Sequence, residues 1–256
     1  MAAFEFFQFP CRTDNYGVLV HDPATGQTAS IDAPEFAAVD AALQARSWSL
    51  THILTTHKHP DHVEGNMALK EKYSCHITGP EGEAKDIPGI DATVAHGDMF
   101  DFADQPVEVI ATPGHTLGQI AYHLPQSQTV FAADALFALG CGRIFEGTPA
   151  QMWLALSRLA ALPPETTVYA GHEYTLANAD FAATIEPENN TLMTRIEDVK
   201  RLRADDLPSL PTSIAAELET NPFLRPQSPA IRARLGMPDA SDEAVFTEIR
   251  HRKDNF

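Results

Sequence analysis

Three histidines and one aspartate fall within the eight residues 55–62, TTHKHPDH. Their spacing is His57-x-His59-x-Asp61-His62. Neutral imidazoles beside a carboxylate are typical ligands of a divalent metal ion. A polar loop that happens to be rich in histidine is the alternative interpretation, and further ligands elsewhere in the chain would decide between the two.

Three further side chains of the same chemistry each follow a stretch with strand composition. His115 follows residues 107–111, Asp134 follows residues 129–133, and His172 follows the sequence TVYA. The first cluster also follows an apolar stretch, LTHILTT. Loops at strand ends on a rigid sheet commonly carry chemistry. Five histidines and two aspartates are too many for one tetrahedral zinc ion and suit two ions that share a bridging carboxylate.

The pattern of apolar residues predicts an α/β domain followed by a helical one. Beyond Tyr174 the strand signals stop, and the remaining segments have helical composition with proline-rich joints. We therefore expect domains over residues 1–173 and 174–256. The elements expected in the first domain are a strand hairpin around residues 23–26, helices over 35–46, 64–73 and 152–162, a short strand at the sequence HIT, and strands over 107–111, 119–124 and 129–133.

Composition limits the kinds of partner. The 256 residues are 44% hydrophobic and 21% charged, with a formal net charge of −17. Residues 1–194 hold 8 Lys and Arg against 24 Asp and Glu. So acidic a body argues against binding to nucleic acid or to an anionic membrane.

The cysteines and the N-terminal sequence bear on the compartment. The three cysteines form no C-x-x-C motif, which favours buried thiols in a reducing compartment. The sequence MAAFEFFQFPC lacks the basic region of a signal peptide, and no run of about 18 apolar residues suggests a membrane span. We expect a cytoplasmic protein, and a monomer.

The motifs THKHPDH, PGHT, AAD and AGHEY, in this order, resemble the metallo-β-lactamase superfamily. More narrowly, the chain resembles the hydroxyacylglutathione hydrolases, or glyoxalase II enzymes. The narrower resemblance includes DNYGVLV, GCGRIFEGT, NPFLR and the terminal RHRKDNF, so it runs along essentially the whole chain. It implies an αββα sandwich with a C-terminal all-helical domain that binds glutathione.

The resemblance also implies roles for the metal-competent residues. His57, His59 and His115 would hold one divalent ion, and Asp61, His62 and His172 would hold the other. Asp134 would bridge the two ions. Zinc is the first expectation, with iron or manganese as alternatives. Asp61 and Asp134 would be the catalytic carboxylates, with Asp61 facing a hydroxide that bridges the ions.

For the substrate, the resemblance implies a glutathione thioester such as S-D-lactoylglutathione, hydrolysed in the second step of methylglyoxal detoxification. Its thiol portion would be bound by Arg143, Tyr174, Arg250 and Lys253. Two positions depart from the human-type pattern, because Arg143 replaces a lysine and Phe145 replaces a tyrosine.

Three other functions compete with this hypothesis. A persulfide dioxygenase shares the implied fold and uses a single iron, but generally lacks a long helical tail. A nucleic-acid-processing hydrolase of the same superfamily conflicts with the acidic charge. A non-catalytic metal-binding role would leave an open set of seven ligands unexplained.

Overall fold

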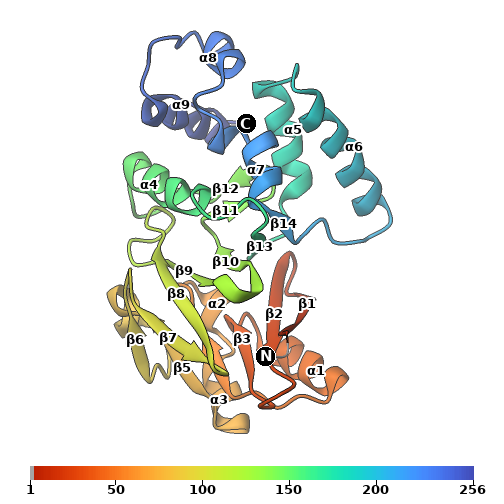
Figure 1. The fold of residues 1–256 in the computed structure, drawn as a ribbon, viewed down its shortest axis with the longest axis vertical. Helices are drawn as coiled ribbons and strands as arrows, with labels where there is room; N and C mark the ends of the chain where they lie inside the picture. The colour runs from red at the N-terminus through yellow and green to blue at the C-terminus, as the bar shows by residue number, and fades with distance from the viewer. Residues whose placement is uncertain (1–2) are drawn as a thin grey trace. The chain divides into compact units, whose positions relative to one another are not determined.

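The computed structural model describes residues 3–256 (Figure 1). Contacts between Cα atoms divide the chain into two compact units. The first unit holds the residues up to Ala111 together with Thr116–Phe131, and the second holds Thr112–His115 together with Ala132–Phe256. Each unit is described separately below.

The first unit contains a six-stranded mixed sheet. Strands β1 to β3 are antiparallel, and β3 to β6 are parallel. Parallel strands buried on both faces read as short apolar runs, which is why only part of this sheet is visible in the sequence. In spatial order the strands are β1 (Glu5–Cys11), β2 (Asn15–His21), β3 (Thr28–Ile31), β4 (His52–Leu54), β5 (His76–Pro80) and β6 (Ala92–Val94).

Helices α1 (Phe36–Arg46) and α3 (Asn66–Tyr73) belong to the same unit (Figure 1). Val39 and Leu43 of α1 and Leu69 of α3 are fully buried in one apolar cluster with Ile53 and Ile77 of the sheet. Burying side chains of this size stabilises the unit by about 1.5–3 kcal/mol each. The sheet is thereby a rigid base for the loop that follows β4.

A second sheet has the order β14-β13-β10-β9-β8-β7. Within the first unit, strand β9 of this sheet contacts the first sheet. The buried Tyr122 hydroxyl of β9 donates a 2.8 Å hydrogen bond to the Thr55 carbonyl after β4. Its strands are β7 (Met99–Phe102), β8 (Gln105–Ala111), β9 (Ile120–Leu124), β10 (Thr129–Ala133), β13 (Thr167–Ala170) and β14 (Thr212–Ser213).

The second unit is mainly helical and encloses a small hairpin, β11 (Leu136–Phe137) and β12 (Gly140–Cys141). The buried Glu217 carboxylate accepts the Leu139 amide at the tip of this hairpin and pairs with Arg195. The helices are α4 (Pro149–Ala160), α5 (Thr175–Ile185), α6 (Asn190–Ala204), α7 (Ile214–Thr220), α8 (Pro229–Leu235) and α9 (Asp242–Asp254).

Most expected elements are present, with the strands after residue 105 confirmed and the hairpin around residues 23–26 formed by β2 and β3. The segment expected as one helix over 64–73 is α3, preceded by the short helix α2 (Pro60–Val63). The expectation that strands end at Tyr174 was wrong, because β14 pairs with β13. A two-residue edge strand is too short to show a period in sequence. No helix within residues 3–256 is long and apolar enough to cross a membrane.

Candidate metal centre

The loop after β4 delivers four of the predicted ligands within six residues. The chain leaves the parallel strand at Thr55, whose amide donates to the Thr78 carbonyl, and is extended up to His59. Pro60 then begins α2 at the first helical position, where a missing N–H costs nothing. The change from extended chain to helix places His57 and His59 before the turn and His62 after it.

Asp32 sits behind this loop and orients two of its histidines. Its buried carboxylate accepts the Thr56 amide at 2.7 Å, the Thr56 hydroxyl at 2.9 Å and Nδ1 of His62 at 2.7 Å. The Thr56 hydroxyl, having donated its proton to Asp32, accepts from Nδ1 of His57 at 3.1 Å. With both Nδ1 atoms protonated, Nε2 of His57 and of His62 keep the lone pairs that bind metal.

Asn15 holds the remaining carboxylate of the loop. Its side-chain amide donates to Asp61 Oδ2 at 3.1 Å and to the Asp61 carbonyl at 3.3 Å, and Asn15 is itself buried. Asp61 Oδ2 lies 3.7 Å from Nε2 of His62. These contacts fix the orientation of the Asp61 carboxylate beside the histidine.

The second unit supplies the other three predicted ligands from three different strand ends. His115 follows β8, Asp134 follows β10 and His172 follows β13, and all three are buried. Asp134 Oδ2 lies 3.3 Å from Nε2 of His115 and 3.3 Å from Nε2 of His172. One carboxylate oxygen therefore faces two imidazole nitrogens, which is the arrangement a bridging ligand needs.

The backbone around residues 142 and 143 orients His115. The carbonyl oxygen of Arg143 accepts a 2.9 Å hydrogen bond from Nδ1 of His115, which leaves Nε2 of this ring unprotonated. The chain passes so close to Asp134 here that a Cβ added at Gly142 would lie 1.9 Å from the Asp134 carbonyl oxygen. Only glycine fits at this position.

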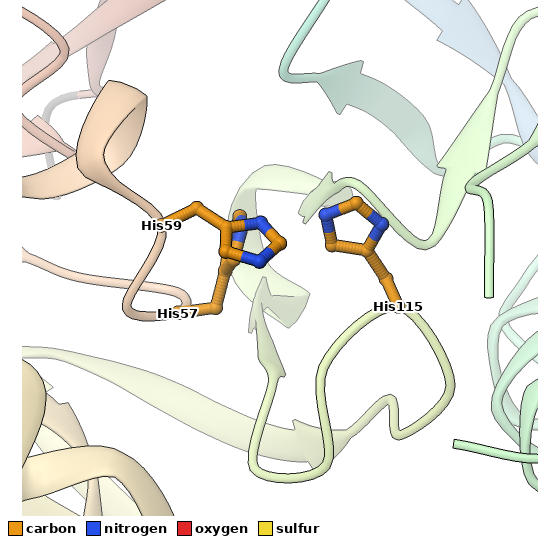
Figure 2. A group of neighbouring side chains, drawn as sticks. All are labelled: His57, His59 and His115. Carbon is orange, nitrogen blue, oxygen red and sulfur yellow. The ribbon is translucent and has the colours of Figure 1, made fainter. Parts of the chain in front are cut away.

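The predicted ligands fall into groups whose ligand atoms all lie within 4.8 Å of one another. Figure 2 shows the side chains of one such group, His57, His59 and His115. Imidazole nitrogens and carboxylate oxygens are ligands that suit a divalent transition metal, and Nδ1 of His57, His62 and His115 is already hydrogen-bonded away from the group. The three groups are His57 with His59 and His115, His57 with His62 and Asp134, and Asp61 with His62 and His172.

The other six histidines belong to none of these groups among the described residues. His123, for example, pairs with Glu108 at 2.8 Å, and His21 stacks on Trp48. The cysteines are buried and free, as expected for packed thiols, and burial raises the pKa of Cys141 to about 11. Cys141 is therefore not a nucleophile at neutral pH.

Two predicted substrate-binding residues lie next to metal-competent histidines. The Tyr174 ring stacks on the ring of His172, with centroids 4.8 Å apart and planes 4° from parallel. Arg143 is exposed, and its guanidinium lies 6.0 Å from the centroid of the exposed Phe145 ring. Phe145 in turn contacts the His115 ring at 5.1 Å. The rings of Phe145 and Tyr174 therefore lie against His115 and His172, respectively.

Helix α9 carries the other two predicted substrate-binding residues, Arg250 and Lys253. Arg250 is buried, donating to the Cys141 carbonyl at 3.1 Å and pairing with Asp254 at 2.8 Å. Lys253 donates to the Ala177 carbonyl at 2.7 Å, and burial, then the charge of Arg250, lower its pKa below the ordinary lysine value. Arg250 thus anchors the helix, while Lys253 is the less buried cation of the two.

Comparison with known proteins defines the class first. The family model described as the metallo-beta-lactamase superfamily matches residues 13–172, and that described as the hydroxyacylglutathione hydrolase C-terminus matches residues 173–256. The two mixed sheets with their helices are the metallo-beta-lactamase fold, which confirms the expected fold class.

Individual relatives narrow the superfamily to one family. A hydroxyacylglutathione hydrolase from Rhizobium meliloti (strain 1021) is 60% identical over 256 residues, which is 100% of each chain. The crystal structure of ETHE1 from Myxococcus xanthus has a TM-score of 0.69 and 29% identity, covering 98% of this chain and 90% of the other. TTHA1623, solved in a di-iron-bound form, shares the fold at a TM-score of 0.64 and 22% identity, covering 85% of this chain and 100% of its own. The chain belongs to the hydroxyacylglutathione hydrolase family of the metallo-beta-lactamase superfamily.

Neither Asp32 nor Asn15 is apparent as a functional residue from sequence. Asp32 is the residue directly after β3, just as Asp134 is the residue directly after β10. An aspartate directly after a buried strand was therefore a usable signal, but without a histidine nearby in sequence it resembles a turn residue. Asn15 offers no comparable signal.

Proposed function

We propose that this protein hydrolyses S-(2-hydroxyacyl)glutathione thioesters, such as S-D-lactoylglutathione, to glutathione and the hydroxy acid. The observation that carries the proposal is the set of metal-competent groups in a chain 60% identical along its length to a hydroxyacylglutathione hydrolase. This reaction is the second step of methylglyoxal detoxification.

The residues suited to hold metal would divide into two ligand sets. His57, His59 and His115 would hold one divalent ion, Asp61, His62 and His172 the other, and Asp134 both. We propose zinc, with iron and manganese as ions that the same ligands accept. Two such ions, when bound, supply hydroxide at neutral pH and polarise the thioester carbonyl.

The protein's own groups would have two tasks in this reaction. Asp61, whose carboxylate accepts a hydrogen bond from Asn15, would accept a proton from the nucleophile. Asp32 keeps the two Nδ1 protons in place, so that the imidazoles cannot rotate or change tautomer during turnover. No general acid is required for the leaving group, because a thiol with a pKa of about 8.5 leaves readily as the thiolate.

Glutathione carries two carboxylates, and we propose that cations of this otherwise acidic chain bind them. Arg143 and Lys253 would contact the carboxylates, Arg250 would contact substrate or set the position of α9, and Tyr174 would contact the peptide from its place on His172. A charged hydrogen bond between guanidinium or ammonium and carboxylate is about twice as strong as a neutral one. Phe145 offers an apolar contact here instead of a hydroxyl.

The remaining assignments concern organisation. We propose residues 1–173 as the catalytic domain and residues 174–256 as the glutathione-binding domain, supported by the family match over residues 173–256. We also propose a monomer, located in the cytoplasm. The three buried free thiols support the reducing compartment.

The direct experiment follows the thioester absorbance of S-D-lactoylglutathione with purified, metal-loaded protein. The expected result is a steady decrease that stops when the metals are removed with a chelator and returns when zinc is added back. Unchanged absorbance would contradict the proposal, and oxygen consumption with glutathione persulfide would replace it by a dioxygenase reaction.

A further inference from the structure

Glu83 is a buried carboxylate outside the ligand set, on the 3-10 helix η1 (Glu81–Asp86) that follows β5. Only 3% of its surface is exposed. Its Oε2 accepts the backbone amide of Lys58 at 2.7 Å, and its Oε1 accepts the backbone amide of Gly118 at 2.9 Å. Lys58 lies between two metal-competent histidines in sequence, and Gly118 lies three residues after a third.

The two loops joined by Glu83 run beside each other but cannot complete their pairing alone. The Ile120 amide donates to the Thr56 carbonyl at 3.0 Å, which begins a ladder between them. Further along, Lys58 and Gly118 both present N–H donors, and two donors cannot bond to each other. A carboxylate with one oxygen for each donor supplies the missing acceptors.

The local sequence leaves room for this carboxylate. A Cβ added at Gly118 would lie 2.6 Å from Cγ of Glu83 and 3.1 Å from its Oε1. Any side chain at residue 118 would therefore push Glu83 away from the two amides. The glycine at residue 118 therefore provides the space that the Glu83 side chain occupies.

We propose that Glu83 is a positioning residue for the loop that carries His57 and His59. By binding the Lys58 amide on the same carboxylate as the Gly118 amide, it holds this loop in place within the first unit (Figure 2). The affinity of these two histidines for a metal ion depends on the position of that loop. The inference rests on the proposed two-metal site and adds to it a residue that touches neither metal nor substrate.

The test measures the release of zinc from the fully loaded protein to a chromogenic chelator, with no substrate present. In Glu83→Gln one oxygen becomes an NH2 group facing an N–H, so one amide loses its acceptor. We expect one zinc equivalent to leave about 10–100-fold faster than in the unaltered protein, and the other at the unaltered rate. His59→Ala and His172→Ala identify which equivalent belongs to which ligand set.

Two further variants separate positioning from general destabilisation. Gly118→Ala keeps Glu83 but displaces it, so it should accelerate the same equivalent. Glu81→Gln, at an exposed glutamate of the same 3-10 helix, should leave both release rates unchanged. Thermal melts of each loaded variant show that the comparison is made on folded protein, and Glu83→Asp, with a shorter reach, serves if Glu83→Gln does not fold.

The result that overturns the inference is a folded Glu83 variant that releases both equivalents at the unaltered rate, or both with equal acceleration. Failure of the proposed function is distinguishable, because the unaltered protein would then bind fewer than two zinc ions or leave the thioester intact. If it binds two and hydrolyses thioester while Glu83→Gln releases both unchanged, only the inference on Glu83 fails.

Discussion

The two units supply metal-competent residues in different ways. In the first unit one short loop gives His57, His59, Asp61 and His62, and side chains from other elements hold that loop from behind, among them Asp32 and Glu83. In the second unit three strand ends give one ligand each. There the ring of His115 is oriented by a hydrogen bond to the backbone carbonyl of Arg143. The first arrangement depends on side chains and is open to mutation, whereas the second depends on the path of the main chain.

The largest effect should come from the second unit, at the residue with two histidine contacts. Asp134→Ala removes the carboxylate that faces Nε2 of both His115 and His172. We expect loss of bound metal and a fall in kcat of about 10³-fold, comparable to removing a main electrostatic group from an active site. Elemental analysis and the thioester assay check this, and an Asp134→Ala protein that retains two metals would contradict the bridging role.

The next effect tests the side-chain support of the first unit. Asp32→Ala leaves Nδ1 of His62 without its acceptor. It also frees the Thr56 hydroxyl that holds Nδ1 of His57, so the rings of His57 and His62 are both less firmly oriented. Metal affinity should fall about 10–100-fold for both ligand sets, in contrast to the single set expected for Glu83. Competition with a chelator measures it. Selective loss of one ion would show that Asp32 serves only one of the two histidines.

A smaller effect, confined to substrate binding, is expected on helix α9. Lys253→Ala should raise KM roughly 10-fold and leave metal content unchanged, because it removes a charged contact to a carboxylate. Equal loss of metal in this variant and in Asp134→Ala would contradict the division between metal-holding and substrate-binding residues. Steady-state kinetics with parallel metal analysis decides between these outcomes.

The lowered pKa of Lys253 gives that contact a pH dependence of known sign. Binding needs the protonated amine, and a lysine whose pKa is depressed by burial loses its proton at a lower pH than an ordinary lysine. In the unaltered protein KM should therefore rise as pH increases toward the alkaline range, and this rise should be absent in Lys253→Ala. Identical KM profiles in the two proteins would exclude Lys253 as the titrating contact.

The smallest effect concerns the exposed aromatic ring beside His115. Phe145→Tyr adds one hydroxyl that could hydrogen-bond to substrate, a change of about 0.5–1.5 kcal/mol. The expected result is a KM lower by about 2–10-fold, with kcat and metal content unchanged. A change in metal content would mean instead that the ring supports the neighbouring histidine.

The contrast between the units also explains what could be predicted from the sequence. All seven metal-competent residues could be proposed, because a dense histidine motif and strand-end positions leave strong local signals, and the structure brings them into three groups. Asp32, Asn15 and Glu83 could not, since each is one ordinary polar residue whose role depends on which backbone or ring lies opposite. The two-residue strand β14 was missed for the same reason, because it exists through pairing with β13.

The most direct measurement titrates metal-free protein with zinc while S-D-lactoylglutathione hydrolysis is recorded. The account predicts no hydrolysis without metal and a rate that reaches its plateau at two zinc ions per chain. A plateau at one ion, or no hydrolysis at any zinc concentration, would contradict a reaction carried out by two ligand sets joined through Asp134.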